Sequence, residues 1–241
     1  MTSRGCPYKC RFCSTTQFWK TIRFHSPEYV GQLISNLKRK GCTHVQIWDD
    51  LFTMNMKRLR DIAPLMKQSG MKYNCQPRTD MITPEVCQLL KSAGVTTCIF
   101  GFESGNNRTL KYVKRGTTTV QINTDAINMC HDAGLKVQGS CMVGVPGETY
   151  EEMLQTVRFI DVCLIKGVQR IWTFVATPFP GTEFWEIFKR KGEVRIKWEE
   201  LSHYSEPLLS TDPEGVRKIM KQIKWRDRKF QWRKLWKLIT K

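Results

Sequence analysis

Along most of the chain, a short apolar run, a loop and a longer amphipathic segment follow one another, and this order repeats. The short apolar runs predict strands. The predicted strands span residues 44–48, 72–76, 96–102, 135–143 and 168–176. The amphipathic segments predict helices, several of which stop at a glycine. The predicted helices span residues 27–40, 55–68, 83–93, 107–113, 120–133 and 150–166.

Alternating strands and helices predict an α/β fold with a parallel sheet. The clearest strand, 96–102, is apolar on both faces, as a strand buried within a parallel sheet requires. Residues 1–4 leave room for only a truncated first strand. Five strand–helix units and this fragment favour a partial (β/α) barrel, although periodicity alone fits an open doubly wound sheet as well. In either architecture, ligands bind at the carboxyl ends of the strands.

The composition narrows the class of protein. The chain has 241 residues, enough for a substantial core in one domain or two. Ten cysteines without a signal-peptide pattern at Met1 favour a cytoplasmic protein over a disulfide scaffold. No apolar run approaches the roughly 18 residues that a membrane-spanning helix needs. The net charge of +17 indicates an anionic partner without identifying it.

Much of this charge lies in residues 217–241, which contain eleven Lys or Arg and one acid. This segment predicts a basic helix with four apolar residues on one face, namely Trp232, Leu235, Trp236 and Ile239. Packing of that face on the core is the favoured interpretation. The alternatives are peripheral contact with an anionic membrane surface and, least favoured, contact with nucleic acid.

Three cysteines lie within eight residues, in the stretch Gly5-Cys6-Pro7-Tyr8-Lys9-Cys10-Arg11-Phe12-Cys13. Thiolates this close together can hold one compact inorganic cluster. Iron–sulfur cubes are usually held by four thiolates, so three would leave one iron open to another ligand. Zinc is the competing metal, but the chain has no second cysteine pair and its four histidines are scattered. The remaining alternative is three unrelated core cysteines.

The Cys-x3-Cys-x2-Cys spacing, with an aromatic residue before the last cysteine, resembles the radical S-adenosylmethionine (radical SAM) superfamily. The wider stretch 2–14 is similar to the radical SAM half of cobalamin-binding enzymes, the subgroup of anaerobic magnesium-protoporphyrin ester cyclases and hopanoid methylases. The resemblance extends to Thr182, and more weakly to Ser210. It implies a six-unit partial barrel, which we expect in residues 1–195, followed by the basic extension in residues 196–241.

The resemblance also implies cofactors. Cys6, Cys10 and Cys13 would hold a 4Fe-4S cluster whose free iron binds the amino and carboxylate groups of S-adenosyl-L-methionine (SAM). One electron then splits SAM and releases a 5′-deoxyadenosyl radical, for hydrogen abstraction or methyl transfer on an organic substrate. Phe12 would lie near the adenine, the alternative being a core aromatic. The implied electron donor is a protein of the flavodoxin or ferredoxin type.

Polar residues at the strand ends are the other candidates for cofactor binding. Asp49 and Asp50 follow the strand 44–48, where many family members have Gly-Gly-Glu, and helix capping is the alternative. Glu103 follows the strand 96–102 and suits an ammonium or ribose hydroxyls, while Ser104 is equally suited to an N-cap. Arg78 follows the strand 72–76 and suits a carboxylate, with a structural salt bridge as the alternative.

Two further loops end the strands 135–143 and 168–176. Their candidate residues for binding the cofactor are Gly144, Pro146, Thr177 and Pro178. Glycines there allow close backbone approach, but ordinary strand-to-helix turns use the same residues. The seven cysteines outside the motif are interpreted as core thiols.

Relatives in the cobalamin-type subgroup carry a cobalamin-binding domain ahead of the radical SAM half. Only five residues precede Cys6, so we expect cobalamin to be used only through a missing or separate domain. The rivals to a radical SAM enzyme are a non-catalytic or split iron–sulfur module that needs a partner, and a nucleic-acid-modifying enzyme.

Overall fold

The computed structural model describes residues 1–192, 202 and 206–239, with side chains described up to residue 226. The strands are β1 (Ser3–Arg4), β2 (Arg23–Phe24), β3 (His44–Gln46), β4 (Lys72–Cys75), β5 (Val95–Glu103), β6 (Lys136–Val143) and β7 (Arg170–Val175). The helices are α1 (Thr15–Trp19), α2 (Pro27–Arg39), α3 (Met56–Ser69), the 3-10 helix η1 (Thr79–Met81), α4 (Pro84–Ser92), α5 (Asn107–Lys114), α6 (Val120–Asp132), α7 (Tyr150–Ile165), α8 (Glu183–Lys189) and α9 (Pro213–Ile239).

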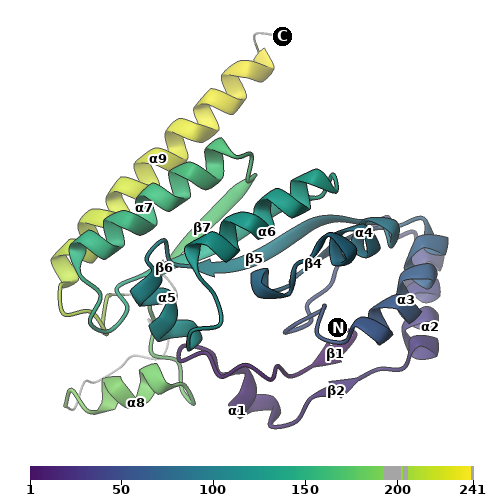
Figure 1. Cartoon of the computed structure of the whole chain (residues 1–241), viewed down its shortest axis with the longest axis horizontal. Coiled ribbons are helices and arrows are strands. Elements are labelled where there is room, and N and C mark those ends of the chain that lie inside the picture. Colours follow the sequence, from purple (N-terminus) through teal and green to yellow (C-terminus); the bar gives the residue numbers. More distant parts are fainter. Residues whose placement is uncertain (193–201, 203–205, 240–241) are drawn as a thin grey trace.

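Five strands form one parallel sheet in the order β3-β4-β5-β6-β7. Because sequential strands are neighbours and a helix lies between each pair, the sheet curls into a half-barrel. Figure 1 shows α6, α7 and α9 on one side of this sheet, and the N-terminal segment with α1, β2 and α8 on the other. The predicted α/β class and partial barrel are therefore confirmed; within the described residues the parallel sheet has five strands, and the truncated first strand lies outside it.

The first strand is truncated, as the sequence predicted, but its pairing differs from the expectation. β1 is a two-residue strand that pairs antiparallel with β2, which the sequence did not predict. It is tied to the end of β3 by side chains, because both carboxylate oxygens of the buried Asp49 accept hydrogen bonds from Thr2 and Ser3. The N-terminal segment is thus held beside the sheet without continuing it.

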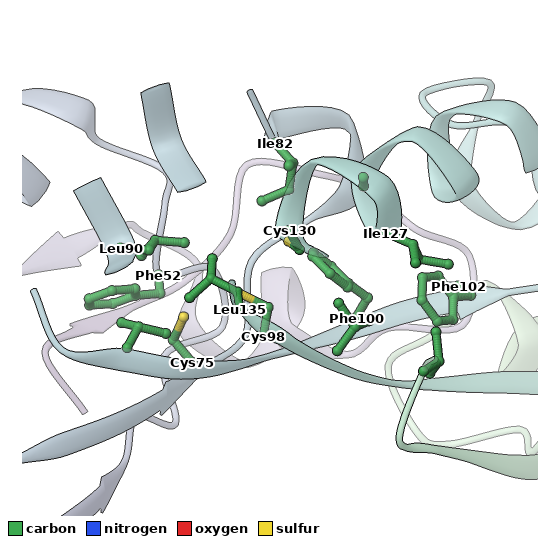
Figure 2. Packing of buried hydrophobic residues seen from close by; sticks show 14 of the residues in the cluster. Phe52, Cys75, Ile82, Leu90, Cys98, Phe100, Phe102, Ile127, Cys130 and Leu135 are labelled. Atoms are coloured by element: carbon green, nitrogen blue, oxygen red, sulfur yellow. The ribbon is translucent and has the colours of Figure 1, made fainter. Parts of the chain in front are cut away.

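The core lies between the sheet and the helices. Alternate residues of β5, among them Phe100 and Phe102, point towards α6, where they meet Ile127 and Cys130 (Figure 2). A Cβ at Gly139 of β6 would come within 2.3 Å of the Phe102 ring, so this packing requires glycine there. Because successive side chains of a strand point to opposite faces, the other set on β5 faces the opposite side of the sheet.

The described part of α9 packs on the core. Val216, Ile219 and Ile223 are buried within the main apolar cluster, and Arg226 lies 3.2 Å from the Asp161 carboxylate of α7. The predicted apolar face of Trp232, Leu235, Trp236 and Ile239 lies outside the described side chains. Along the part of the chain that the structure describes, no helix is both long and apolar enough to cross a membrane.

Candidate functional site

A cavity of about 390 Å³ lies at the carboxyl ends of the strands, a volume within the usual range for small-molecule sites. Its apolar walls come from β5, β6 and β7, through Ile99, Met142 and Phe174. Its polar lining comes from the N-terminal loop, from α1 and α5, and from the segments at the ends of β3, β4 and β5, through Tyr8, Thr15, Asp50, Gln76, Arg78, Glu103 and Lys114. Cys6, Cys10, Cys13 and Phe12 close one end of this cavity.

The cysteine loop is fixed to distant parts of the chain by its own backbone. The amide of Arg11 donates to the carbonyl of Val113 at the end of α5, at 3.0 Å, and the carbonyl of Arg11 accepts from the amide of Phe184 in α8, at 3.3 Å. Arg115 donates through Nε to the carbonyl of Lys9 at 2.6 Å. The position of the three thiols is therefore set by contacts with two helices far away in sequence.

A glycine starts the loop because only glycine fits there. Gly5 has a φ of +90°, and a Cβ on it would lie 2.8 Å from the carbonyl oxygen of Thr21. Its amide donates to a carboxylate oxygen of Asp50 at 2.8 Å, and Thr15 donates to the other oxygen at 3.2 Å. Asp50 thus lines the cavity while holding both ends of the cysteine loop.

Arg78, after β4, lines the cavity and connects the cysteine loop to Asp80 and Thr117. Its guanidinium binds both carboxylate oxygens of Asp80, at 2.9 and 3.0 Å, and donates to the Thr117 hydroxyl at 2.8 Å. A further N–H donates to the Cys10 sulfur, with Nη1 and Sγ 3.6 Å apart. The same group stacks on the Tyr8 ring, 3.5 Å from its centroid. Arg78 therefore places a fixed positive charge against one cysteine sulfur.

Glu103 is aimed into the cavity by an irregularity at the end of β5. The register with β6 shifts between Gly101 and Glu103, and Glu103 adopts a φ of +66°. Such bulges re-aim side chains next to active sites, and positive φ is costly for a residue with a Cβ. A Cβ on Gly101 would lie 2.2 Å from a Glu103 carboxylate oxygen, so the small residue makes room for this carboxylate.

The Glu103 carboxylate is buried beside a single ammonium group. The Nζ of Lys114, in α5, lies 3.7 Å from it, and both side chains are almost fully buried. Burial raises the pKa of Glu103, and the charges of Lys114 and Arg78 lower it. Neither Lys114 nor Asp80 was predicted as a site residue, because nothing in their local sequence separates them from surface charges.

The remaining predicted residues divide into two groups. Phe12 and Thr177 line the cavity. Asp49, Ser104, Gly144, Pro146 and Pro178 do not belong to its lining. Asp49 binds the N-terminal segment as described above, and the Ser104 hydroxyl is hydrogen-bonded to the hydroxyl of Thr156 in α7 at 2.9 Å. Their cofactor contacts stay predictions.

The three cysteines are half-buried. Burial raises the pKa of the Cys6 and Cys10 thiols, while the Arg78 charge lowers it. Within the described residues, no three His, Cys, Asp or Glu side chains surround a point that a single metal ion could occupy. A cube differs from such a site because each thiolate binds a different iron.

The loop after β6 contains another buried acid, Glu148. Its carboxylate accepts hydrogen bonds from the amides of Gly144 and Val145, at 2.8 and 3.1 Å. Burial has the largest effect on the pKa of Glu148 and raises it, whereas these two hydrogen bonds lower it. The resulting pKa is raised from 4.5 to about 7. Glu148 therefore shapes the turn that holds Gly144 and Pro146.

This raised pKa predicts a pH-dependent stability. Between pH 4.5 and about 7 the folded chain keeps the Glu148 proton and the unfolded chain releases it. The free energy of unfolding should then fall as the pH rises through this interval, by about 1.4 kcal/mol for each unit of pKa difference. Urea unfolding of the parent and of Glu148→Gln across this range measures the effect. Equal pH slopes in the two proteins would show that Glu148 does not cause it.

Comparison with known proteins identifies the family to which this chain belongs. Residues 1–160 match the model of the radical SAM superfamily. An uncharacterized methyltransferase of Pyrococcus horikoshii is 38% identical over 190 residues, which cover 77% of this chain and 40% of that protein. The anaerobic magnesium-protoporphyrin IX monomethyl ester cyclase of Rubrivivax gelatinosus is 24% identical over 240 residues, 95% of this chain and 41% of that protein. The chain therefore spans less than half the length of these relatives.

A solved structure shares the fold. TsrM from Kitasatospora setae, a radical S-adenosylmethionine methyltransferase with cobalamin and a 4Fe-4S cluster bound, superimposes with a TM-score of 0.69. The match covers 82% of this chain and 37% of that one, at 18% identity. At this sequence identity, the structural similarity shows a shared fold. It does not show a shared reaction, which has to be argued from the residues of the site.

Proposed function

Since this chain belongs to the radical SAM superfamily, we propose that it is the catalytic half of an enzyme that cleaves SAM reductively to start radical chemistry. One observation carries the proposal. The three thiols of one short loop line the same cavity as Glu103 and Arg78, which come from the carboxyl ends of the strands. A cluster held by the loop would therefore face a ligand held by the strands.

The residues present fit a 4Fe-4S cluster on Cys6, Cys10 and Cys13. The thiols border one cavity, and the charged N–H of Arg78 beside the Cys10 sulfur suits a thiolate ligand. When bound, the cluster supplies the electron that breaks a carbon–sulfur bond of SAM and yields a 5′-deoxyadenosyl radical. The protein's part is to bind, orient and shield the reactants.

The cavity offers distinct partners for the two ends of SAM. The buried Glu103 carboxylate suits the ammonium group of the methionine part, because an ionised acceptor strengthens such a hydrogen bond. The walls of Ile99, Met142 and Phe174 suit the apolar faces of the adenosine part and exclude water from it. Lys114 holds Glu103 in place by its ion pair and donates to the carbonyl of Gly101 at 2.5 Å.

Within this class, we favour methyl transfer to an organic substrate over hydrogen abstraction alone. Support comes from the Pyrococcus relative, named a methyltransferase, and from the fold shared with TsrM, which binds cobalamin. Cobalamin would then be held by polypeptide outside this chain, as a further domain or a separate protein. A protein of the flavodoxin or ferredoxin type would supply the electron.

Electron paramagnetic resonance of the reduced, reconstituted protein tests the proposed site. If SAM binds to the open iron of a three-cysteine cluster, its addition should shift the g values of the signal. S-adenosylhomocysteine, which lacks the sulfonium methyl group, serves as a comparison ligand. A signal that stays the same at saturating SAM would contradict binding at the cluster.

Arg78 should set the reduction potential of the cluster. Its charge and its N–H towards Cys10 stabilise the more negative, reduced form, so Arg78→Gln should lower the potential. A charged hydrogen bond contributes about 1–3 kcal/mol, and about 1.4 kcal/mol corresponds to about 59 mV for one electron. We therefore expect a fall of roughly 40–130 mV in a potentiometric titration.

Two variants make this result specific. Arg78→Lys keeps the charge but loses the planar fork, so its potential should lie between those of the parent and Arg78→Gln. Arg60→Gln removes an exposed arginine paired with Glu85 on the helices outside the sheet, and it should leave the potential unchanged. If the reduction potential of the cluster is the same in Arg78→Gln and in the parent, Arg78 does not set this potential and its role is structural.

A further inference from the structure

The cysteine loop also borders a second depression, whose other lining residues differ from those of the first cavity. This depression has a volume of about 720 Å³, and Cys6, Cys10 and Cys13 line it as well. Its other lining residues come from the loop itself, α1, the turn before β2, the end of α5 and the start of α8, and include Pro7, Lys9, Gln17, Lys20, Ile22, Arg115, Glu183 and Glu186. We call this surface the outer cysteine face; Figure 1 shows α1, β2 and α8 on one side of the molecule.

The carboxylates of the outer cysteine face are already neutralised. Glu183 pairs with Arg11 at 2.8 Å and also with Arg115, so one acid is shared by two arginines. Glu186 pairs with Lys189 at 2.7 Å. These acids therefore leave a net positive charge beside the loop.

The lysines of this face are not neutralised. Lys9 and Lys20 are exposed, and within the described residues neither has a carboxylate within ion-pair distance. Arg4 and Arg23 extend the positive surface, stacking on Trp19 at 5.4 and 5.6 Å from its ring centroid. Lys9 and Lys20 thus place positive charge in the lining of the depression that reaches the cysteines, and Arg4 and Arg23 add charge on β1 and β2.

Exposed apolar side chains accompany this charge. Phe18 of α1 is 73% exposed and Ile22 is 40% exposed. Large apolar residues inside a charged rim are typical of a protein-binding surface. Phe18 packs edge-on against Trp19, with ring centroids 4.7 Å apart, so it is held in place while remaining accessible.

We propose that the outer cysteine face is the docking surface for a small acidic one-electron carrier protein. The inference rests on the proposed function, because a reducible cluster on these cysteines needs an electron from outside. The face is suited to this role by two properties: it reaches the cluster ligands directly, and its charge is complementary to an acidic carrier. The cavity assigned to SAM is a separate depression that reaches the strand ends, so a carrier docked on the outer cysteine face would leave it open.

The electron balance is simple. A flavodoxin hydroquinone releases one electron and becomes the semiquinone, and the cluster takes this electron and passes from its oxidised to its reduced state. No covalent bond forms or breaks during this transfer. The carrier then leaves, and the next electron requires another encounter on the same face.

Charge reversal on the reconstituted holoprotein tests the proposal, with an acidic flavodoxin as the probe. Lys20→Glu/Arg23→Glu should weaken flavodoxin binding and slow cluster reduction by flavodoxin hydroquinone, each by about tenfold or more at low salt. Raising the salt concentration should lower the rate of cluster reduction in the parent towards that of the variant, because salt screens the attraction between the basic face and the acidic flavodoxin. The matched control is Lys72→Glu/Lys136→Glu, two exposed lysines at the amino ends of β4 and β6. It makes the same charge change at the opposite edge of the sheet.

Dithionite separates docking from chemistry. The Lys20→Glu/Arg23→Glu protein should keep the parent's iron content and its rate of SAM cleavage with dithionite, a small reductant that does not need a docking surface. If binding and reduction by flavodoxin are equal in this variant and in the control pair, the docking proposal is wrong. If dithionite-reduced parent protein fails to cleave SAM, the proposed function fails, and the binding titration still decides whether this face binds the carrier.

Discussion

Replacing Cys6, Cys10 and Cys13 together with alanine should abolish both the cluster and the cleavage of SAM. The parent protein, reconstituted without oxygen, should hold about four irons and four sulfides, and the triple variant should hold close to none. The physical reason is that these thiols lie in one loop bordering one cavity, while the other cysteines lie elsewhere. Iron and sulfide analysis with the visible absorption spectrum measures the loss.

The other cysteines provide the control. Cys87 and Cys163 are fully buried in the core, where their pKa values are raised by their surroundings. Cys87→Ala and Cys163→Ala should keep the cluster, even though each removes some core packing and lowers the melting temperature. A cube retained by the triple variant would show that the loop is not its binding site.

Removing the charge of Glu103 should have the second-largest effect. Glu103→Gln keeps the shape of the side chain but loses the ionised acceptor for the ammonium group of SAM. The expected cost is about 1–3 kcal/mol of binding free energy, or roughly 5- to 150-fold in Kd. Isothermal titration of the reconstituted protein with SAM measures it, and the iron content should stay the same.

Two further variants distinguish a loss of SAM binding from a loss of stability. Glu103→Gln leaves the buried ammonium of Lys114 without its carboxylate, which destabilises the fold. Glu103→Gln/Lys114→Met removes both charges, so it should regain stability without regaining SAM affinity. Glu85→Gln, which removes an exposed carboxylate on α4, should change neither property. If Glu103→Gln binds SAM as tightly as the parent, the Glu103 carboxylate has a structural role only and does not bind SAM.

The regular elements could be predicted from the sequence because their patterns are strong. The run 96–102 became β5 (Val95–Glu103), and the amphipathic segment 27–40 became α2 (Pro27–Arg39) with Ser26 as its N-cap. α1, β2 and α8 were missed, since each spans between two and seven residues and shows no clear period. Short elements of this kind are fixed by tertiary contacts, which the sequence pattern does not contain.

The site was predictable only in part, for a related reason. The spacing of Cys6, Cys10 and Cys13 is a local feature that the sequence displays, and all three line one cavity in the structure. The roles of Lys114 and Asp80 arise from contacts across elements, with Glu103 and Arg78 respectively. Tertiary packing likewise explains how Glu103 enters the cavity, because the shift in register and the positive φ depend on the neighbouring strand β6.

The formation of 5′-deoxyadenosine from SAM by the reconstituted chain tests the central claim most directly. The measurement is made without oxygen, with dithionite as reductant and the triple cysteine variant in parallel, and the product is quantified by liquid chromatography and mass spectrometry. A cluster on Cys6, Cys10 and Cys13 that faces SAM in the cavity predicts 5′-deoxyadenosine from the parent and none from the variant. A parent protein that holds about four irons, binds SAM and releases no 5′-deoxyadenosine after reduction would contradict the claim.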